Sequence, residues 1–210
     1  MDVTKQPLDL KEKDSQSLLS RIVPILLKNG LKSTTMDSVA AALGMSKRTL
    51  YERFGSKSNM IKEVLGQLER ENKEKVTKIF AEADNVMEGM IQVFRYNRDL
   101  IGSTNVDFYR DMDRLYKEER EVFDKSRESN HEKMMLIYQR GIDQGMFRSD
   151  TDFEVQSRII RLQMEALKRV EELFPADITL QRVFDGIMVG FLRSIASEKG
   201  MKILDKQLTT

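Results

Sequence analysis

Apolar residues recur along this chain at intervals of three and four positions, which is the period of an amphipathic α-helix. In the first segment of this kind, Leu18, Ile22, Ile25 and Leu26 fall on one helical face. Few runs alternate between apolar and polar residues as a half-buried strand would, and the chain contains only three prolines. The pattern predicts an all-α fold with almost no strand.

The same spacing predicts about nine helices in total. They are expected over residues 14–29, as two short helices within 34–54, and over 58–83, 84–100, 104–126, 127–144, 151–174 and 178–198. Breaks between the later helices are expected at Gly102, at Gly141 and Gly145, and at Pro175. Pro24 lies inside the first helix, where its missing N–H and its ring predict a bend or a solvent-facing position.

Two short helices joined by a tight turn are predicted between residues 34 and 54. Thr34 followed three residues later by Asp37 is close to a capping box, which begins a helix. Val39 and Ala40 belong to the buried face of that helix, and the small Ala40 lets a second helix cross closely. The first helix of the pair is therefore expected to start at this threonine.

The turn and the second helix are marked by equally local signals. Gly44 suits the left-handed conformation that ends a helix, and the hydroxyl of Ser46 can cap the helix that follows. Leu50 and Phe54, four residues apart, point inward from this second helix. Helix, tight turn and helix together predict a helix-turn-helix.

The outward side of the second helix is basic and hydroxylated, and it is slim enough to enter a major groove of DNA. Arg48 or Lys47 could bind guanine O6 and N7, Thr49 could touch a thymine methyl, and Tyr51 could bond a phosphate. Lys57 would clamp the DNA backbone from the start of the next helix. The DNA-binding residues we expect are Thr34, Thr35, Ser46, Lys47, Arg48, Thr49, Tyr51 and Lys57.

Between Leu18 and Leu65 the chain resembles the tetracycline-repressor (TetR) family of bacterial regulators. The resemblance rests on Val39-Ala40, Leu43-Gly44, Ser46, Thr49-Leu50-Tyr51, Phe54 and Ser56-Lys57. Leu-Tyr-x-x-Phe with a following Lys is more specific than a bare helix-turn-helix. The resemblance implies a three-helix DNA-binding head, a helical regulatory domain, and a homodimer formed through the last two long helices.

This implied organisation divides the chain between residues 57 and 58. Residues 1–57 are expected to form an N-terminal arm and the helix-turn-helix domain, and residues 58–210 a ligand-binding and dimerisation domain. By the resemblance, the dimer interface would contain Ile159, Leu162, Ala166, Val183, Ile187 and Gly190. From the apolar pattern alone, these two stripes fit an intramolecular core equally well.

Methionine and aromatic residues gather in the middle of the chain, where such stripes are more often ordinary core than a pocket. In the family that the chain resembles, however, the corresponding helices enclose a site for an inducer. The residues expected to line such a site are Met90, Phe94, Phe108, Met112, Tyr116, Met135, Tyr138 and Gln163. A flexible apolar cavity with a few hydroxyls would suit a hydrophobic or amphipathic small molecule of unknown identity.

Charge is distributed unevenly along the chain. Residues 1–57 hold ten Lys and Arg against six Asp and Glu, whereas the remainder holds 25 against 28. A basic head on a slightly acidic body fits a head that meets phosphate. The first 14 residues lack the apolar stretch of a signal peptide, and nowhere do 18 apolar residues run together, so a cytoplasmic protein is expected.

The composition offers little material for catalysis. The chain has no cysteine, which removes thiolate catalysis and cysteine-based zinc sites. His131 is its single histidine and lies in a polar helical face, where we expect a solvated surface residue. We therefore expect no enzyme activity, no cofactor and no metal site.

These observations predict a sequence-specific DNA-binding transcriptional regulator. Its expected mode is repression, with a dimer released from a palindromic double-stranded operator by a small-molecule inducer. A helical scaffold or protein-interaction module without DNA binding is the alternative, and a ligand-binding helical enzyme is a more distant one. The helical periodicity fits all of these, but only the regulator explains the cluster from Ser46 to Lys57.

Overall fold

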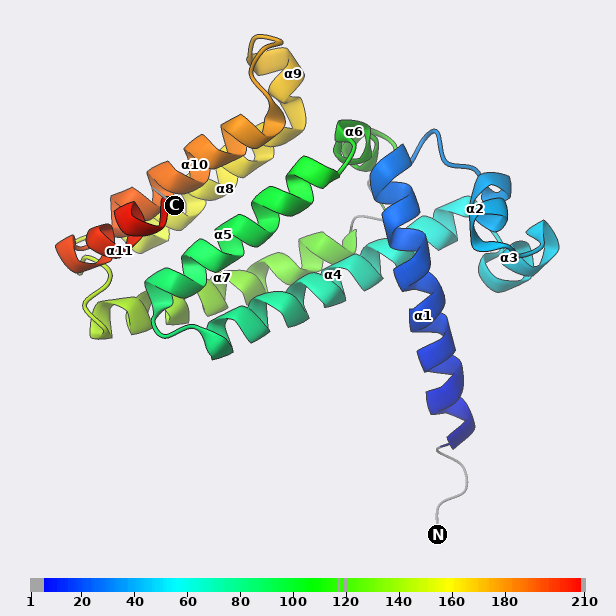
Figure 1. The fold of residues 1–210 in the computed structure, drawn as a ribbon, viewed down its shortest axis with the longest axis horizontal. Helices are drawn as coiled ribbons and strands as arrows, with labels where there is room; N and C mark the ends of the chain where they lie inside the picture. Colours follow the sequence, from blue (N-terminus) through cyan, green and yellow to red (C-terminus); the bar gives the residue numbers. More distant parts are fainter. Residues whose placement is uncertain (1–5, 117, 119–120, 209–210) are drawn as a thin grey trace. The chain divides into compact units, whose positions relative to one another are not determined.

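The computed structural model describes residues 6–116, 118 and 121–208, and these residues are helical almost throughout (Figure 1). The helices are α1 Gln6–Asn29, α2 Met36–Leu43, α3 Lys47–Phe54, α4 Lys57–Glu82, α5 Val86–Ser103, α6 Val106–Arg114, α7 Glu121–Asp143, α8 Phe153–Ala166, α9 Val170–Leu173, α10 Leu180–Ile195 and α11 Glu198–Leu208. A 3-10 turn, Leu167–Arg169, separates α8 from α9. Extended pairing within the described residues is limited to one bridge between Phe147 and Ala196. The predicted all-α fold is confirmed.

The chain forms two compact units. The head unit comprises residues 1–73 and 104–124, and the body unit comprises residues 74–103 and 125–210. The head unit contains α1, α2, α3, the first part of α4, and α6, which joins it from a later part of the chain. The predicted functional division between residues 57 and 58 stays a prediction, because the compact units divide within α4 and not at its start.

The head unit is organised around one apolar cluster. Its fully buried members come from every helix of the unit, and they are Ile22, Leu26, Leu31, Val39, Leu50, Met60, Ile61, Leu65 and Phe108. Each such side chain contributes about 1.5–3 kcal/mol when it is buried. Pro24 is exposed on α1 and the helix continues past it, so the predicted solvent-facing position is confirmed.

The body unit has a second cluster, formed by α5, α7, α8, α10, α11 and the loop after α7. Aromatic rings lie at its centre. The ring of Tyr138 stacks on Phe153 with centroids 4.0 Å apart and on Phe147 at 5.6 Å. The Tyr138 hydroxyl donates to the carbonyl oxygens of Arg148 and Thr151, which satisfies the polar end of a buried side chain.

Several predicted helix bounds were wrong. The helix expected over 104–126 ends at Arg114, and α7 begins at Glu121. The intervening sequence contains neither Gly nor Pro, so no local signal marks the break. Residues 117, 119 and 120 of this stretch lie outside the described residues.

Other differences lie toward the C-terminal end. The helix expected over 151–174 is divided at Ala166, and α11 was not predicted at all. Gly141 does not break α7; it lies inside the helix, where the absence of a side chain leaves room for the ring of Phe147. The turn falls at Gly145, which has a φ of +68°. These breaks depend on tertiary contacts that the local sequence does not reveal.

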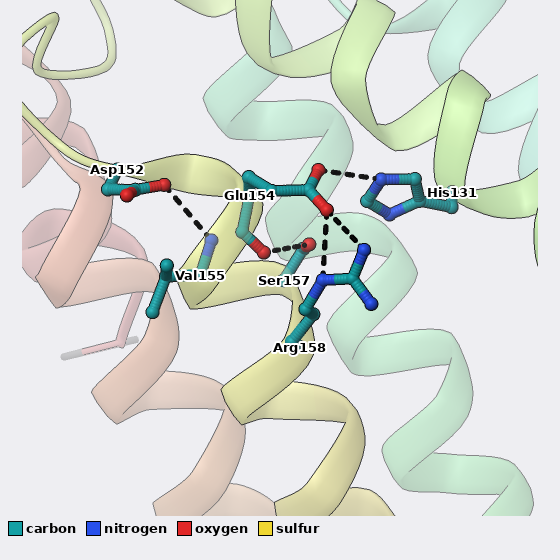
Figure 2. A network of polar contacts seen from close by, with 6 residues as sticks. All are labelled: His131, Asp152, Glu154, Val155, Ser157 and Arg158. Carbon is teal, nitrogen blue, oxygen red and sulfur yellow. Dashed lines mark hydrogen bonds and ion pairs between the residues drawn. The ribbon is translucent and has the colours of Figure 1, made fainter.

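A polar network joins α7 to α8 within the body unit (Figure 2). Glu154 accepts hydrogen bonds from Arg158 and lies 2.9 Å from Nε2 of His131 through its Oε2 atom. The His131 side chain is only 22% exposed, so the expectation of a solvated surface histidine was wrong. A carboxylate on the neighbouring helix, invisible in the local sequence, gives the ring its partner.

We predict that Gly141→Ala destabilises the body unit by about 1–3 kcal/mol. A Cβ at this position would overlap the ring of Phe147, which is held by its stacking on Tyr138. The free energy of unfolding from urea titration measures the effect. Gly66→Ala on α4 is the matched control, because its Cβ would meet only Arg70 Nη1 at 3.5 Å, and it should gain about 0.5–1 kcal/mol. Equal effects at both positions would contradict this packing.

A second prediction concerns acid. The hydrogen bond from Arg158, and more weakly that from His131, holds the pKa of Glu154 below its ordinary value of 4.5. A carboxyl whose pKa is depressed by folding stabilises the protein above its unfolded pKa and loses this effect as the pH falls through the folded pKa. Glu154→Gln should therefore lower the free energy of unfolding at pH 7, and the difference from wild type should close below about pH 4.5.

Urea titrations at several pH values test this prediction. Glu74→Gln, a change at an exposed residue of α4 in the body unit, is the matched control. A gap between Glu154→Gln and wild type that stays constant from pH 7 to pH 4 would show that the Glu154 charge does not contribute.

Candidate nucleic-acid interface

The first helix of the predicted pair begins one residue later than expected. Thr35 caps α2, because its Oγ1 accepts the N–H of Ser38 at 3.1 Å and its own N–H donates to Oγ of Ser38 at 2.9 Å. Thr34 is buried instead, with its hydroxyl donating to the Gly30 carbonyl at 2.7 Å. The predicted capping by Thr34 and Asp37 was therefore wrong. When α2 starts at residue 36, the Met36 side chain is buried in the core. This burial favours Thr35 over Thr34 as the N-cap of α2.

The turn between α2 and α3 has the predicted geometry. Gly44 adopts the left-handed conformation with φ of +67°, and the N–H of Met45 donates to the Ala40 carbonyl at 3.0 Å. Ser46 then caps α3, because its Oγ accepts the N–H of Thr49 at 3.0 Å. The helix-turn-helix is confirmed, and it is held by capping bonds at both sides of the turn.

Helix α3 turns its apolar residues inward and its basic residues outward. Leu50 and Phe54 are buried in the head cluster, as predicted. Lys47, Arg48 and Tyr51 are exposed on the opposite side. The predicted residues Ser46 and Thr49 lie at the same exposed N-terminal end, with their hydroxyls 2.7 Å apart. The first turn of this surface carries no acidic residue.

Lys47 and Arg48 of α3 each form an exposed ion pair. Lys47 lies 2.8 Å from Asp37, whose hydrogen bond raises the pKa of the lysine, and Arg48 lies 2.8 Å from Glu52. Pairs this exposed contribute little to stability, because solvent screens the attraction between their charges. Both cations can therefore exchange a carboxylate for a phosphate or a base at little cost.

A partly exposed ion pair joins α3 to α4. Nη1 and Nη2 of Arg53 bind the two carboxylate oxygens of Glu63 at 3.0 and 2.6 Å, and the guanidinium also stacks on the ring of Phe54. A two-bond contact of this kind fixes orientation as well as distance. The local sequence does not reveal this ion pair, since ten residues separate Arg53 from Glu63 and no local pattern links them.

A second polar group, also missed from the sequence, ties α1 to α4. The carboxylate of Glu71 accepts from Ser20 at 2.7 Å and from the amide of Gln67 at 2.7 Å. Arg70 in turn donates to the buried Gln67. The head helices are thus joined by hydrogen bonds as well as by apolar packing.

Lys57, the predicted phosphate clamp, lies at the start of α4 and is half-buried. Its Nζ donates to the Lys32 carbonyl at 3.0 Å. The neighbouring peptide group is also held, because the N–H of Lys32 donates to Asp111 on α6 at 2.7 Å. Burial lowers the pKa of Lys57, and the negative charge of Asp111 opposes that change.

The residues predicted to line a ligand pocket fall in both units. Phe108, Met112 and Tyr116 belong to the head cluster or pack against it. Met90, Met135 and Tyr138 do the same in the body unit. Phe94 stacks on Phe184 with centroids 5.8 Å apart, and Gln163 is exposed on α8. Most of these side chains serve as core, and their role as a pocket stays a prediction.

The residues predicted at a dimer interface are only partly covered within the chain. Ile159 is 41% exposed and Leu162 71% exposed on α8, and Gly190 is exposed on α10. Ala166 and Ile187 are half-buried, whereas Val183 is buried. The large exposed apolar side chains lie on α8, and the adjacent α10 adds the half-buried Ile187 and the exposed Gly190. Exposed apolar surface of this kind is typical of a surface that a partner covers.

The part of the chain that the structure describes lacks two further kinds of feature. No helix there is both long enough and apolar enough to cross a membrane. Nor do three or more His, Asp or Glu side chains of these residues gather in a way that could hold a metal ion.

Comparison with known proteins gives a consistent result. Residues 19–64 match the sequence model described as "Bacterial regulatory proteins, tetR family". The HTH-type transcriptional repressor KstR2 of Mycolicibacterium smegmatis is 28% identical over 164 residues, which cover 76% of this chain and 78% of that protein. The family match contains the whole helix-turn-helix and the start of α4.

Solved structures share the fold. The ketosteroid transcriptional regulator KstR2 of Mycobacterium tuberculosis has a TM-score of 0.51 at 21% identity, covering 87% of this chain and 94% of that one. A transcriptional regulator of Saccharomonospora viridis, in complex with choline, has a TM-score of 0.68 at 13% identity, covering 89% and 100%. A scaffold without DNA binding would leave the family match and the exposed face of α3 unexplained. Residues 19–64 are similar to the DNA-binding domain of the TetR family of bacterial regulatory proteins, and the chain is a DNA-binding transcriptional regulator.

Proposed function

We propose that this regulator is a repressor that binds a palindromic operator as a homodimer and leaves it when a small molecule binds. The observation that carries the proposal is the exposed face of α3, on which Lys47, Arg48, Thr49 and Tyr51 surround a capped helix N-terminus. The relationship to KstR2, named as a transcriptional repressor, supports repression as the direction of control. The chain would act by binding and not by catalysis, in the cytoplasm where its DNA target lies.

In this proposal the side chains of α3 divide their roles. Arg48 reads a guanine through O6 and N7, which discriminates by about 1–3 kcal/mol against another base. Thr49 contacts a thymine methyl, and Tyr51 and Lys57 bind phosphates and set the position of α3 in the groove. Thr35 and Ser46 lie at the helix ends, where hydroxyls can reach the DNA backbone.

The surface of α8 and α10 supports dimerisation. Ile159 and Leu162, together with Ile187 and Gly190, would pack against the same residues of a second copy. Leu162 is the strongest support, because this residue is 71% exposed within the chain. A two-fold dimer would place its two α3 helices in successive major grooves, about 34–36 Å apart.

Similar proteins support release by a small molecule. One structural relative is named a ketosteroid transcriptional regulator, and another was solved in complex with choline, which supports a small-molecule ligand for this chain. The methionines and aromatic residues named above favour a hydrophobic or amphipathic inducer. To invert a 99:1 population, the inducer must prefer the released conformation by about 10⁴-fold.

The division of roles on α3 gives a direct test. Arg48→Ala should relax the preference for one base of the selected operator, at about 1–3 kcal/mol. Tyr51→Ala and Lys57→Ala should weaken binding to operator and unrelated duplexes alike, and Lys57→Ala should reduce the slope of log K against log salt by about 1. Fluorescence anisotropy titrations with both duplexes at several salt concentrations measure these effects.

The control is Lys202→Ala, which removes an exposed cation on α11 of the body unit. It should leave both affinities unchanged. Loss of affinity by the same factor in all three α3 and α4 variants, on every duplex, would contradict the assignment of Arg48 to base recognition.

The proposed dimer gives a second test. Leu162→Glu should shift the protein from dimer to monomer in light-scattering measurements, because it places a charge in an apolar interface. The affinity for the palindromic operator should fall as the dimer is lost. Leu136→Glu is the matched control, since Leu136 on α7 has the same exposed fraction of 71%. A dimer that persists in Leu162→Glu would place the interface elsewhere.

A further inference from the structure

The ammonium group of Lys57 is held inside the head unit. It donates to the Lys32 carbonyl, and its side chain is half-buried between the start of α4 and the loop after α1. A partly buried cation depends on nearby negative charge more than an exposed one does. Negative charge near the Lys57 ammonium therefore affects how readily this group can bind a DNA phosphate.

That negative charge comes from α6. Asp111 is buried, with 7% of its surface exposed, and its Oδ2 accepts the N–H of Lys32 at 2.7 Å. Both side chains thus bind the backbone of Lys32: Lys57 donates to its carbonyl oxygen, and Asp111 accepts from its N–H. Asp111 and the ammonium of Lys57 are separated by the single residue Lys32, and the negative charge of Asp111 raises the pKa of Lys57 against the effect of burial.

The rest of the contact brings α6 close to this loop. Asn105, which caps α6, donates through its N–H to the Leu27 carbonyl at 2.8 Å and through its side chain to the Lys28 carbonyl at 3.3 Å. Gly30 follows with φ of +81°, and a Cβ there would lie 3.2 Å from Cβ of Asp107. The start of α6 is therefore docked on the end of α1, and this docking fixes where Asp111 lies.

We propose that Asp111 tunes the affinity of the head for DNA by competing with phosphate for Lys57. The inference rests on the proposed function, and specifically on Lys57 as a phosphate contact. With Asp111 charged, the ammonium is attracted inward toward the Lys32 loop. A DNA phosphate must draw it away from that attraction, so the carboxylate lowers affinity on every DNA sequence.

Asp111→Asn tests the proposal, because the amide oxygen can still accept from Lys32 while the charge is gone. We expect affinity for operator and unrelated duplexes to rise by about threefold to tenfold, the range that one nearby charge contributes at partial burial. Asp107→Asn is the matched control. It removes the same charge from the same helix, but Asp107 pairs with Arg110 and not with the Lys32 loop.

A double-mutant cycle with Lys57→Met separates the proposed role from a merely structural one. If Asp111 acts through Lys57, then Asp111→Asn should have no effect beyond that of Asp107→Asn once Lys57 is Met. If Asp111 only docks α6, the effect of Asp111→Asn should persist in the Lys57→Met background, and the proposal is overturned. Equal changes in Asp111→Asn and Asp107→Asn would overturn it as well.

Thermal melting of each variant establishes that the head is folded. Asp111→Ser, which keeps a hydrogen-bonding oxygen without a charge, gives a second uncharged variant if Asp111→Asn is unstable. Wild-type protein that binds no duplex at all would refute the proposed function and this inference together. Wild-type binding without coupling between Asp111 and Lys57 would refute this inference alone.

Discussion

The orientation of α3 is the constraint on which the function depends, and the burial of Leu50 and Phe54 fixes it. These two side chains lock one side of a short helix into the head cluster. A rotation about the helix axis would expose them at about 1.5–3 kcal/mol each. Because they point inward, Lys47, Arg48 and Tyr51 face solvent, so the residues proposed to bind DNA are positioned by residues buried in the core.

Polar contacts refine this arrangement at the edges of the core. The two-bond contact between Arg53 and Glu63 holds α3 against α4, while Asp111 and Lys57 join α6, the loop after α1 and α4 around one residue. On the outer face of α3, by contrast, the ion pairs are exposed and weak. The head thus combines strong contacts that hold helices with weak ones that DNA can replace.

Local sequence predicted the features that local physics decides. Gly44 predicted the turn and Ser46 predicted the N-cap of α3, because a left-handed backbone and hydroxyl capping depend on a few neighbouring residues. Local sequence could not decide whether Thr34 or Thr35 caps α2, because that depends on the burial of Met36. Nor could it predict the environment of His131 on α7, because the partner of the ring is a carboxylate on α8. The unpredicted α11, the divided helix after residue 150 and the role of Asp111 arise from contacts between distant segments.

Selection of binding sites from a random duplex pool, at about 150 mM salt where nonspecific binding is weakened, tests the central claim most directly. The account predicts an enriched inverted repeat whose half-sites are spaced by about one turn of DNA or a multiple of it. Folded, ligand-free protein that enriches no sequence would contradict it, because the exposed face of α3 would then have no base to read.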